Sequence, residues 1–247
     1  MYPILSHWFA LSNIGARQHN EDAWAANSAV SVENGTWNIW AVADGLGGHE
    51  GGQVAARLAV EAATSPALMS EADPAAVVDK AIRAAQNAVL AEINKSGHYD
   101  MSTTLVVLAS WQGHIAWGHV GDSRVYRFRD GKHELLTRDH SLAWALALSE
   151  GRDIGDLRTM AERNQLISVL GQAEPRIEVG SAVEIVRGDR YLLCTDGWWE
   201  PVTEPIMANC LAVNTEPEEW LRCMNAHIAV VNNTEQDNHT ALAVFFD

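Results

Sequence analysis

Aspartate recurs in this chain at places where an apolar run meets a glycine or a tight turn. Three such runs lead into Asp44, Asp122 and Asp196, and two further polar clusters containing aspartate lie at 20–22 and 236–238. Apolar runs of this length are typical of buried strands, and loops at strand ends can gather side chains at one edge of a sheet. The sequence therefore predicts a rigid scaffold that brings several carboxylates together.

Carboxylates held within a few ångström repel one another, and each has a raised pKa unless a cation offsets the charge. Mg²⁺ and Mn²⁺ prefer oxygen ligands and keep several waters, so a few aspartates and a glycine carbonyl suffice to hold them. Two such ions about 4 Å apart can share one carboxylate and lower the pKa of a water between them. A single Asp-Gly predicts only a turn, but the repetition along this chain favours a site for divalent ions.

The chain is strongly acidic, because 32 Asp and Glu outnumber 17 Lys and Arg and give a formal net charge of −15. This surplus repels a phosphate backbone, so nucleic acid and anionic membrane surfaces are not expected partners. The 47% of hydrophobic residues indicate an ordinary globular core. With 247 residues, no linker-like stretch and no apolar run long enough for a membrane span, one domain over 1–247 is expected.

The three cysteines, Cys194, Cys210 and Cys223, are widely spaced and form no CxxC pair. This pattern predicts neither a disulfide framework nor a zinc site. The N-terminus also lacks a basic region followed by an apolar run. A reducing cytoplasm is therefore the expected location.

The pattern of apolar residues predicts strands and helices in separate runs. Strands are expected at 7–11, 37–43, 102–110, 113–120, 124–129, 182–186, 190–194 and 240–246. Helices are expected at 53–63, 74–93, 203–212 and 217–231, with helical or mixed structure at 141–150 and 157–170. Because strands and helices do not alternate one by one, the fold class is α+β with antiparallel sheets.

The residues around the aspartates resemble the metal-dependent PPM protein phosphatases, the protein phosphatase 2C family, in its compact bacterial form. The matching blocks stand in family order and cover about 7–246, namely 15–22 (GARQHNED), 42–52 (VADGLGGHEGG), 101–104 (MSTT), 118–124 (GHVGDSR), 137–141 (TRDHS), 193–197 (LCTDG) and 237–240 (DNHT). The resemblance implies a four-layer α-β-β-α sandwich, in which two antiparallel sheets are flanked by antiparallel helices.

The same resemblance implies two Mn²⁺ or Mg²⁺ ions. Asp44 would bridge both ions, and Gly45 would offer its carbonyl to the second. Asp196 and Asp237 would complete the protein ligands of the first ion, and Asp22 would hold waters of the second ion from its outer shell.

Three further roles follow from the family pattern. Asp122, with Asp196, would support a third, weaker ion, and Arg17 would clamp the substrate phosphate through its planar guanidinium. Some family members place a histidine directly after Asp-Gly as the general acid. This chain has Leu46 there and His49 three residues later, so His49 is either that general acid or a residue that shapes the loop.

The activity implied is hydrolysis of phosphoserine and phosphothreonine by in-line attack of a metal-bridged hydroxide, without a phosphoenzyme. The expected partners are phosphorylated proteins, namely a cognate Hanks-type serine/threonine kinase or its targets. Residues 117–124 resemble family members that act beside such a kinase in type VI secretion. Residues 141–171 correspond to the family's flap and are expected to tune substrate choice. A monomer is expected.

Two alternatives stay open at this point. The first is a pseudophosphatase that keeps the fold as a phosphoprotein-binding scaffold, although Asp44, Asp196 and Asp237 are all intact. The second is another two-metal hydrolase, such as a phosphodiesterase or nuclease. The acidic composition and the lack of evident histidine ligands disfavour that second alternative.

Overall fold

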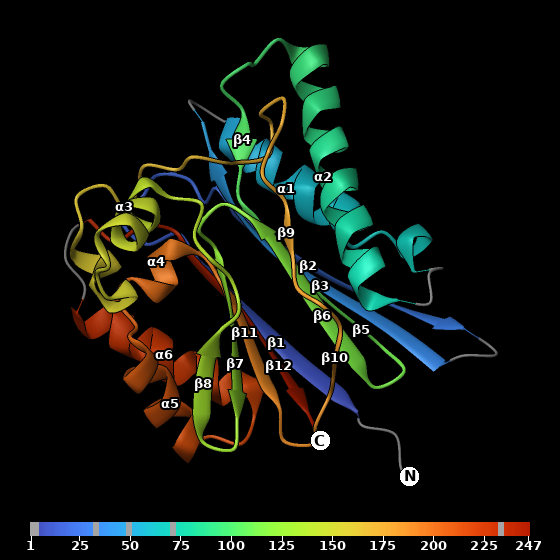
Figure 1. The fold of residues 1–247 in the computed structure, drawn as a ribbon, viewed down its shortest axis with the longest axis vertical. Helices are drawn as coiled ribbons and strands as arrows, with labels where there is room; N and C mark the ends of the chain where they lie inside the picture. The colour runs from blue at the N-terminus through green and yellow to red at the C-terminus, as the bar shows by residue number, and fades with distance from the viewer. Residues whose placement is uncertain (1–4, 32–34, 48–50, 70–72, 232–234) are drawn as a thin grey trace.

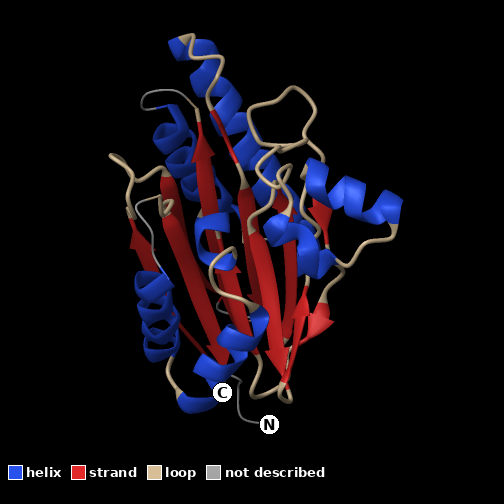
Figure 2. Ribbon diagram, turned by 90° about the vertical axis from the view of Figure 1, so that its left-hand side faces the viewer, coloured by secondary structure: helices blue, strands red, loops and turns tan. Residues whose placement is uncertain are grey.

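Two antiparallel β-sheets pack face to face, and helices cover the outer face of each sheet (Figure 1; Figure 2). The computed structural model describes residues 5–31, 35–47, 51–69, 73–231 and 235–247, with 154–156 in backbone only. The architecture is the four-layer α-β-β-α sandwich predicted from the sequence. Within these ranges no helix has the length and apolar character needed to cross a membrane.

The strands form two sheets with separate orders. Sheet A runs β1 (Ser6–Asn13), β12 (His239–Phe246), β11 (Arg190–Cys194), β7 (Arg124–Arg129) and β8 (Lys132–Leu135). Sheet B runs β10 (Val183–Glu184), β6 (His114–Val120), β5 (Leu105–Trp111), β3 (Gly35–Leu46) and β2 (Asp22–Ser31). Two short strands, β4 (Ser102–Thr103) and β9 (Glu178–Val179), pair with β3 and β6. Each pairing between these strands is antiparallel.

The helices lie in two outer layers. Sheet B is covered by α1 (Gly51–Ala63) and α2 (Pro74–Ser96), and sheet A by α4 (Asp196–Trp199), α5 (Glu204–Val213) and α6 (Pro217–Val231). Helix α3 (Leu142–Glu150) and the 3₁₀ turns η1 (Pro66–Leu68) and η2 (Ile154–Thr159) lie in the connections. Helix α2 begins where the sequence predicts, because the Asp73 side chain accepts a hydrogen bond from the Ala75 N–H at 3.0 Å.

Side chains alternate between the two faces of the central strands, so one face packs on the helices and the other packs between the two sheets. In β3, Ile39 and Ala41 face the helices over sheet B, whereas Trp40 and Val42 pack between the two sheets. Strand β12 alternates in the same way over residues 241–246. Successive side chains of a strand point to opposite faces, so strands that are apolar on both faces lie in the middle of the four layers.

Two stretches differ from the sequence-based expectation. Strand β2 is not among the predicted strands, because its small and polar residues lack the β-branched signature; ten register pairs with β3 hold it. The stretch 157–170 is not helical beyond η2. Its backbone bonds to distant segments instead, since Leu142 N donates to Gln165 O at 2.8 Å and Leu170 N donates to Thr103 O at 2.9 Å.

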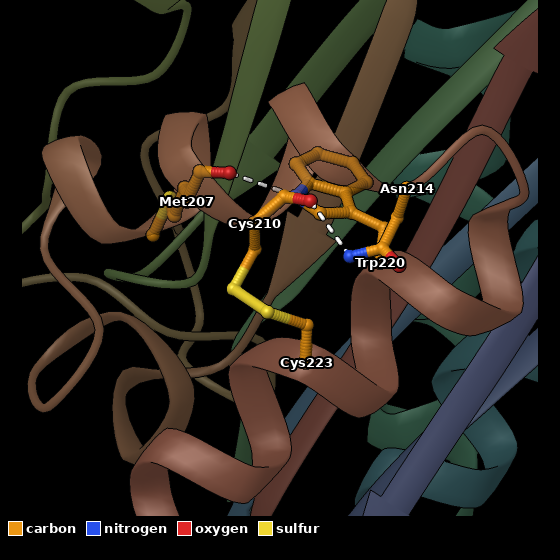
Figure 3. The surroundings of a disulfide bond; sticks show 5 residues. All are labelled: Met207, Cys210, Asn214, Trp220 and Cys223. Carbon is orange, nitrogen blue, oxygen red and sulfur yellow. Dashed lines mark hydrogen bonds between the residues drawn. A yellow bond between two sulfur atoms is a disulfide. The ribbon is translucent and has the colours of Figure 1, made fainter.

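A disulfide joins Cys210 of α5 to Cys223 of α6 (Figure 3). The expectation of no disulfide was wrong, because the packing of two consecutive helices brings together cysteines that are 13 residues apart, at a Cα–Cα distance of 5.8 Å. Beside the bond, Trp220 Nε1 donates a hydrogen bond to the Met207 carbonyl at 2.9 Å. The third cysteine, Cys194, is buried and free.

Replacing Cys210 and Cys223 together by alanine is expected to lower the free energy of unfolding by about 3 kcal/mol, because closing a loop of this size removes conformational entropy from the unfolded chain. Urea denaturation of the oxidised protein, the reduced protein and the double variant measures this. The reduced protein serves as the control and should match the variant. Equal stability of the oxidised and reduced proteins would contradict a stabilising role.

Candidate metal centre

The strand ends that carry the aspartates meet at one end of the sandwich. In sheet B, the start of β2 pairs with the end of β3, which places Asp22 opposite Asp44. In sheet A, the end of β11 lies beside the starts of β7 and β12. The residues just outside these three ends, Asp122, Asp196 and Asp237, therefore share one edge.

A cavity of about 460 Å³ opens at this end of the sandwich. Its wall combines residues singled out in the sequence, namely Arg17, Asp44, Gly45, Asp122, Asp196 and Asp237. Asp22 is buried close by, and its carboxylate accepts a hydrogen bond from Thr195 Oγ1 at 3.0 Å. The candidate general acid His49 lies outside the described residues.

The backbone of Asp44 is clamped by two threonines of the MSTT block. Asp44 N donates to Thr104 Oγ1 at 2.9 Å, and Thr103 Oγ1 donates to the Asp44 carbonyl at 2.8 Å. The next residue must be glycine, because a Cβ on Gly45 would lie 2.2 Å from the Gly52 carbonyl oxygen. These contacts fix the Asp44 side chain and leave the Gly45 backbone open to the cavity.

Asn238 fastens the C-terminal part of the site to the N-terminal loop. Its side-chain oxygen accepts from Glu21 N at 2.8 Å, and its amide nitrogen donates to the carbonyls of Ile14 and His19 at 2.8 and 3.0 Å. Gly197 packs closely on the same residue, since a Cβ there would lie 2.0 Å from the Asn238 carbonyl oxygen. Residues far apart in the sequence are thereby held in one constellation.

Arg17 lies at the mouth of the cavity. Apart from histidine, it is the only residue with a cationic side chain among the described residues that line the cavity. Its Nη2 donates to Asp237 Oδ2 at 2.6 Å, with the Arg17 side chain 59% exposed. The hydrogen bond to Asp237, followed by the charge of that carboxylate, raises the pKa of Arg17, so the guanidinium stays protonated. An exposed, charged guanidinium next to a carboxylate cavity is suited to an oxyanion ligand.

Four aspartates of this cluster hold protons more tightly than free aspartates. Burial raises the pKa of Asp22 to about 8 and that of Asp196 to about 6. Burial, followed by the charge of Asp196, raises the pKa of Asp44 and of Asp122 well above the ordinary value. A hydrogen bond between the side chains of Asp44 and Asp196 adds to the rise in the pKa of Asp44 and opposes the rise in the pKa of Asp196. Like charges in a buried site share protons when nothing else neutralises them.

Two buried oxygens in this cluster have no hydrogen-bond partner, Asp22 Oδ1 and Asp196 Oδ1. Buried polar atoms are normally satisfied, so such orphans call for a missing ligand. Oxygen donors, raised pKa values and orphaned carboxylate atoms are together what a hard divalent cation requires. The residues present therefore fit divalent metal ions, with Asp44 central to the cluster.

Asp122 is supported from behind by a buried ion pair. Arg124 donates to both oxygens of Asp139, at 3.0 and 2.7 Å, and its guanidinium lies 3.5 Å from the Trp199 ring centroid. Trp199 Nε1 in turn donates to the Asp122 carbonyl at 3.1 Å. A bidentate pair of this kind fixes geometry as well as charge.

His119, His140 and Glu178 form a second group of metal-binding residue types, with ligand atoms within 4.8 Å of one another. His119 Nε2 donates to the Arg138 carbonyl at 2.8 Å, and His140 Nδ1 accepts from Gly121 N at 3.2 Å. Burial lowers the pKa of both histidines, that of His140 to about 4, so both rings are neutral at pH 7. The group braces the turn before Asp122.

Some residues of the site were not assigned roles from the sequence. Thr103 and Thr104 belong to a motif block, but only the folded chain shows that they hold Asp44. Asn238 follows Asp237 directly, and this position next to a predicted metal ligand is the feature of the sequence that could have indicated its role. The cavity also contains Glu21 and Asn164, and nothing in the sequence placed Asn164 there.

The raised pKa of Asp22 predicts a pH-dependent stability for the metal-free protein. Between its ordinary 3.8 and about 8, the folded state binds more protons than the unfolded state, so stability falls as pH rises through that window. The substitution Asp22→Asn removes the ionisable group and with it this loss of stability. It is expected to raise Tm near the upper end of the pH window, by roughly 2–4 °C for each kcal/mol of unfolding free energy regained.

Calorimetric melting across this window, in EDTA, measures the effect. Asp79→Asn is the matched control, because Asp79 is an exposed carboxylate on α2 that pairs with Arg83. The same pH slope in Asp22→Asn and wild-type protein would show that Asp22 does not carry the penalty.

The chain matches known proteins over most of its length. A family model described as protein phosphatase 2C matches residues 11–236. The chain is 32% identical over 196 residues to the serine/threonine protein phosphatase PstP of Mycobacterium tuberculosis, covering 76% of this chain and 37% of PstP. It thus spans well under half the length of that relative.

Two solved structures share the fold over nearly the whole chain. One is PppA, a key regulatory component of T6SS in Pseudomonas aeruginosa, with 28% identity, a TM-score of 0.78 and 98% of each chain covered. The other is the catalytic domain of PstP in complex with 2 manganese ions, with 26% identity, a TM-score of 0.77 and 99% of each chain covered. The family model matches residues 11–236, and the aspartates of its motifs lie together in one cavity. The chain therefore belongs to the protein phosphatase 2C family.

Proposed function

We propose that this chain is a metal-dependent serine/threonine protein phosphatase that hydrolyses phosphoserine and phosphothreonine. The observation that carries the proposal is the cavity in which Asp44, Asp122, Asp196 and Asp237 face an exposed guanidinium of Arg17. An acidic pocket binds a phosphate dianion only when cations neutralise it. The named activities of similar proteins, PstP above all, support this reading.

The proposed ligands are those that the family pattern implies. Asp44 and the Gly45 carbonyl would hold two Mn²⁺ or Mg²⁺ ions with Asp196 and Asp237, and Asp22 would act through waters. Asp122 would support a third, weaker ion. The bound ions would supply a water of lowered pKa and positive charge for the phosphate.

The residues of this chain would bind and orient the substrate. Asp237 and an incoming phosphate present similar pairs of oxygens to Arg17, so the phosphate would compete for the guanidinium and be fixed by two parallel hydrogen bonds. The Thr103 and Thr104 clamp would keep Asp44 in place as charge changes in the cavity. His49 remains the proposed donor of a proton to the leaving oxygen.

The alternatives are less well supported by the cavity. A pseudophosphatase scaffold would not need four carboxylates held in one cavity with orphaned buried oxygens. A nuclease would have to bring a polyanion to a chain of net charge −15. Binding of Mn²⁺ without turnover of any phosphopeptide would favour the scaffold.

We infer a single catalytic domain over 1–247, in which 141–171 is a flap beside the cavity. The chain would act as a monomer. Its substrates would be a Hanks-type serine/threonine kinase or that kinase's targets, and similarity to PppA suggests a T6SS setting. Phosphoproteomics after deletion of the gene tests these partners.

The cytoplasm is the proposed location. Thiol reductants there would reduce the Cys210–Cys223 disulfide that the structure contains, so both cysteines would be thiols in the cell. Thiol labelling in intact cells tests this, and an oxidised pair would contradict the location.

Chelating divalent metal is expected to abolish activity. With Mn²⁺ present, the protein should hydrolyse both p-nitrophenyl phosphate and a phosphothreonine peptide, and Asp44→Asn should lose at least about a hundredfold in kcat/KM for both. Equal activity with Mn²⁺ and in excess EDTA would contradict the metal-dependent mechanism.

Arg17→Ala is expected to lower kcat/KM by about a hundredfold, because a charged bidentate contact with the phosphate is lost. Arg187→Ala is the matched control, since Arg187 is exposed and is not among the residues that line the cavity. Equal kcat/KM in Arg17→Ala and Arg187→Ala would exclude Arg17 from phosphate binding.

A further inference from the structure

A second cleft lies beside the catalytic cavity and is not used by the proposed mechanism. It has a volume of about 450 Å³ and is lined by residues of α3 and its neighbours, including Arg138, Trp144, Leu148, Ile167 and Arg176. We call it the flap cleft. It combines exposed arginines with large exposed apolar side chains.

One strip of backbone separates the flap cleft from the catalytic cavity. Leu166 lines the cavity, and the next residue, Ile167, lines the cleft. The strip is fixed on the far side, because Ser141 and Leu166 form a β-bridge and Ile167 N donates to the His140 carbonyl at 2.8 Å. A peptide whose phosphoryl group enters the cavity could therefore reach the cleft with a neighbouring segment.

The charge of the flap cleft is opposite to that of the molecule. Arg138 is exposed, and no carboxylate of the described residues forms an ion pair with it; Arg187 is the other arginine in that situation. Arg176 is 60% exposed and pairs with Glu178. The acid in the wall, Asp139, is only 3% exposed and neutralised by Arg124. Because the whole chain has a net charge of −15, the cleft is a local exception.

The apolar part of the cleft is also open to solvent. Leu148 is 68% and Ile167 is 50% exposed, on either side of Trp144, which is 8% exposed. Helix α3 buries its opposite face, including Ala143 and Ala147, in a small core of its own. Leu148 and Ile167 thus leave half or more of their surface open to solvent, and a substrate side chain of similar size would shield that surface from water.

We propose that the flap cleft binds a flanking segment of the phosphoprotein substrate, in which an acidic side chain pairs with Arg138 and Arg176 and a neighbouring large apolar side chain covers Leu148 and Ile167. This inference rests on the proposed phosphatase activity and names the substrate class that the site selects. The acidic surface repels acidic peptides in general, so the cleft selects those that place the acid in this one position.

Phosphothreonine peptides test the proposal. A set is made in which an acidic residue and an adjacent leucine are moved through each position on both sides of the phosphothreonine, with matched peptides carrying the amide in place of the acid or serine in place of leucine. At the best position, wild-type kcat/KM is expected to be about three- to tenfold higher for the acidic, apolar peptide than for either matched peptide. The acidic preference should shrink as salt is added.

Arg138→Gln should abolish the acidic preference, and Leu148→Ser should abolish the preference for leucine. Arg187→Gln is the matched control, because it removes the other unpaired arginine and the same charge. It should leave both preferences at their wild-type values. Thermal melting of all three variants checks the fold, and the salt dependence of the wild-type preference needs no variant.

Two results would overturn the proposal. If the wild-type protein hydrolyses the peptides in Mn²⁺ without preference at any position, or if Arg138→Gln keeps the acidic preference, the cleft does not select substrates although the phosphatase assignment stands. If no peptide is hydrolysed with Mn²⁺ present, the phosphatase assignment fails and the cleft proposal fails with it.

Discussion

Mutual repulsion among buried carboxylates is the constraint on which the rest of this structure depends. Two sheets meet so that Asp22, Asp44, Asp122, Asp196 and Asp237 lie at one end of the sandwich. Burial and proximity raise the pKa of four of these groups, which is unfavourable for a fold that keeps them ionised. The surrounding residues hold these carboxylates in place. Threonine hydroxyls bond to the Asp44 backbone, glycines occupy positions where no Cβ fits, and Asn238 joins the C-terminal part of the site to its N-terminal loop. Divalent cations are the remaining component that such a site requires.

The sequence predicted those parts that local pattern determines. Aspartates after apolar runs, the Asp73 cap of α2 and the two-sided apolar strands all follow from rules that act over a few residues. Strand β2 does not follow from such rules, because it is an edge strand of small and polar residues. Pairing with β3 stabilises it, and the strand propensity of its own residues is low. The stretch 157–170 and the Cys210–Cys223 disulfide were mispredicted because both depend on tertiary contacts. Residues outside 157–170 supply backbone hydrogen bonds to it, and the packing of α5 against α6 brings the two cysteines together. The clamp on Asp44 and the flap cleft required the folded chain, as they join residues separated by 20 or more positions.

The net charge of −15 divides into parts with different roles. Some acids belong to the cavity, where cations would offset them. Others are paired one by one with arginines, from the buried Arg124–Asp139 pair to exposed helix pairs such as Arg83–Asp79. Against this background, two arginines mark where anionic groups can approach. They are Arg138 in the flap cleft, with which no described carboxylate forms an ion pair, and Arg17 at the mouth of the cavity. The two cavities that these arginines line adjoin each other at Leu166 and Ile167.

The most direct measurement of the central claim is the release of protons when Mn²⁺ binds. Calorimetric titrations of Mn²⁺ near neutral pH, repeated in buffers of different ionisation enthalpy, count these protons. If the carboxylates share protons until a cation replaces them, binding releases protons from groups such as Asp22, whose pKa is raised to about 8, and from Asp44. Proton release should then fall in Asp22→Asn. Binding of Mn²⁺ with no proton release, or no binding at all, would contradict the assignment of this cluster as the metal centre.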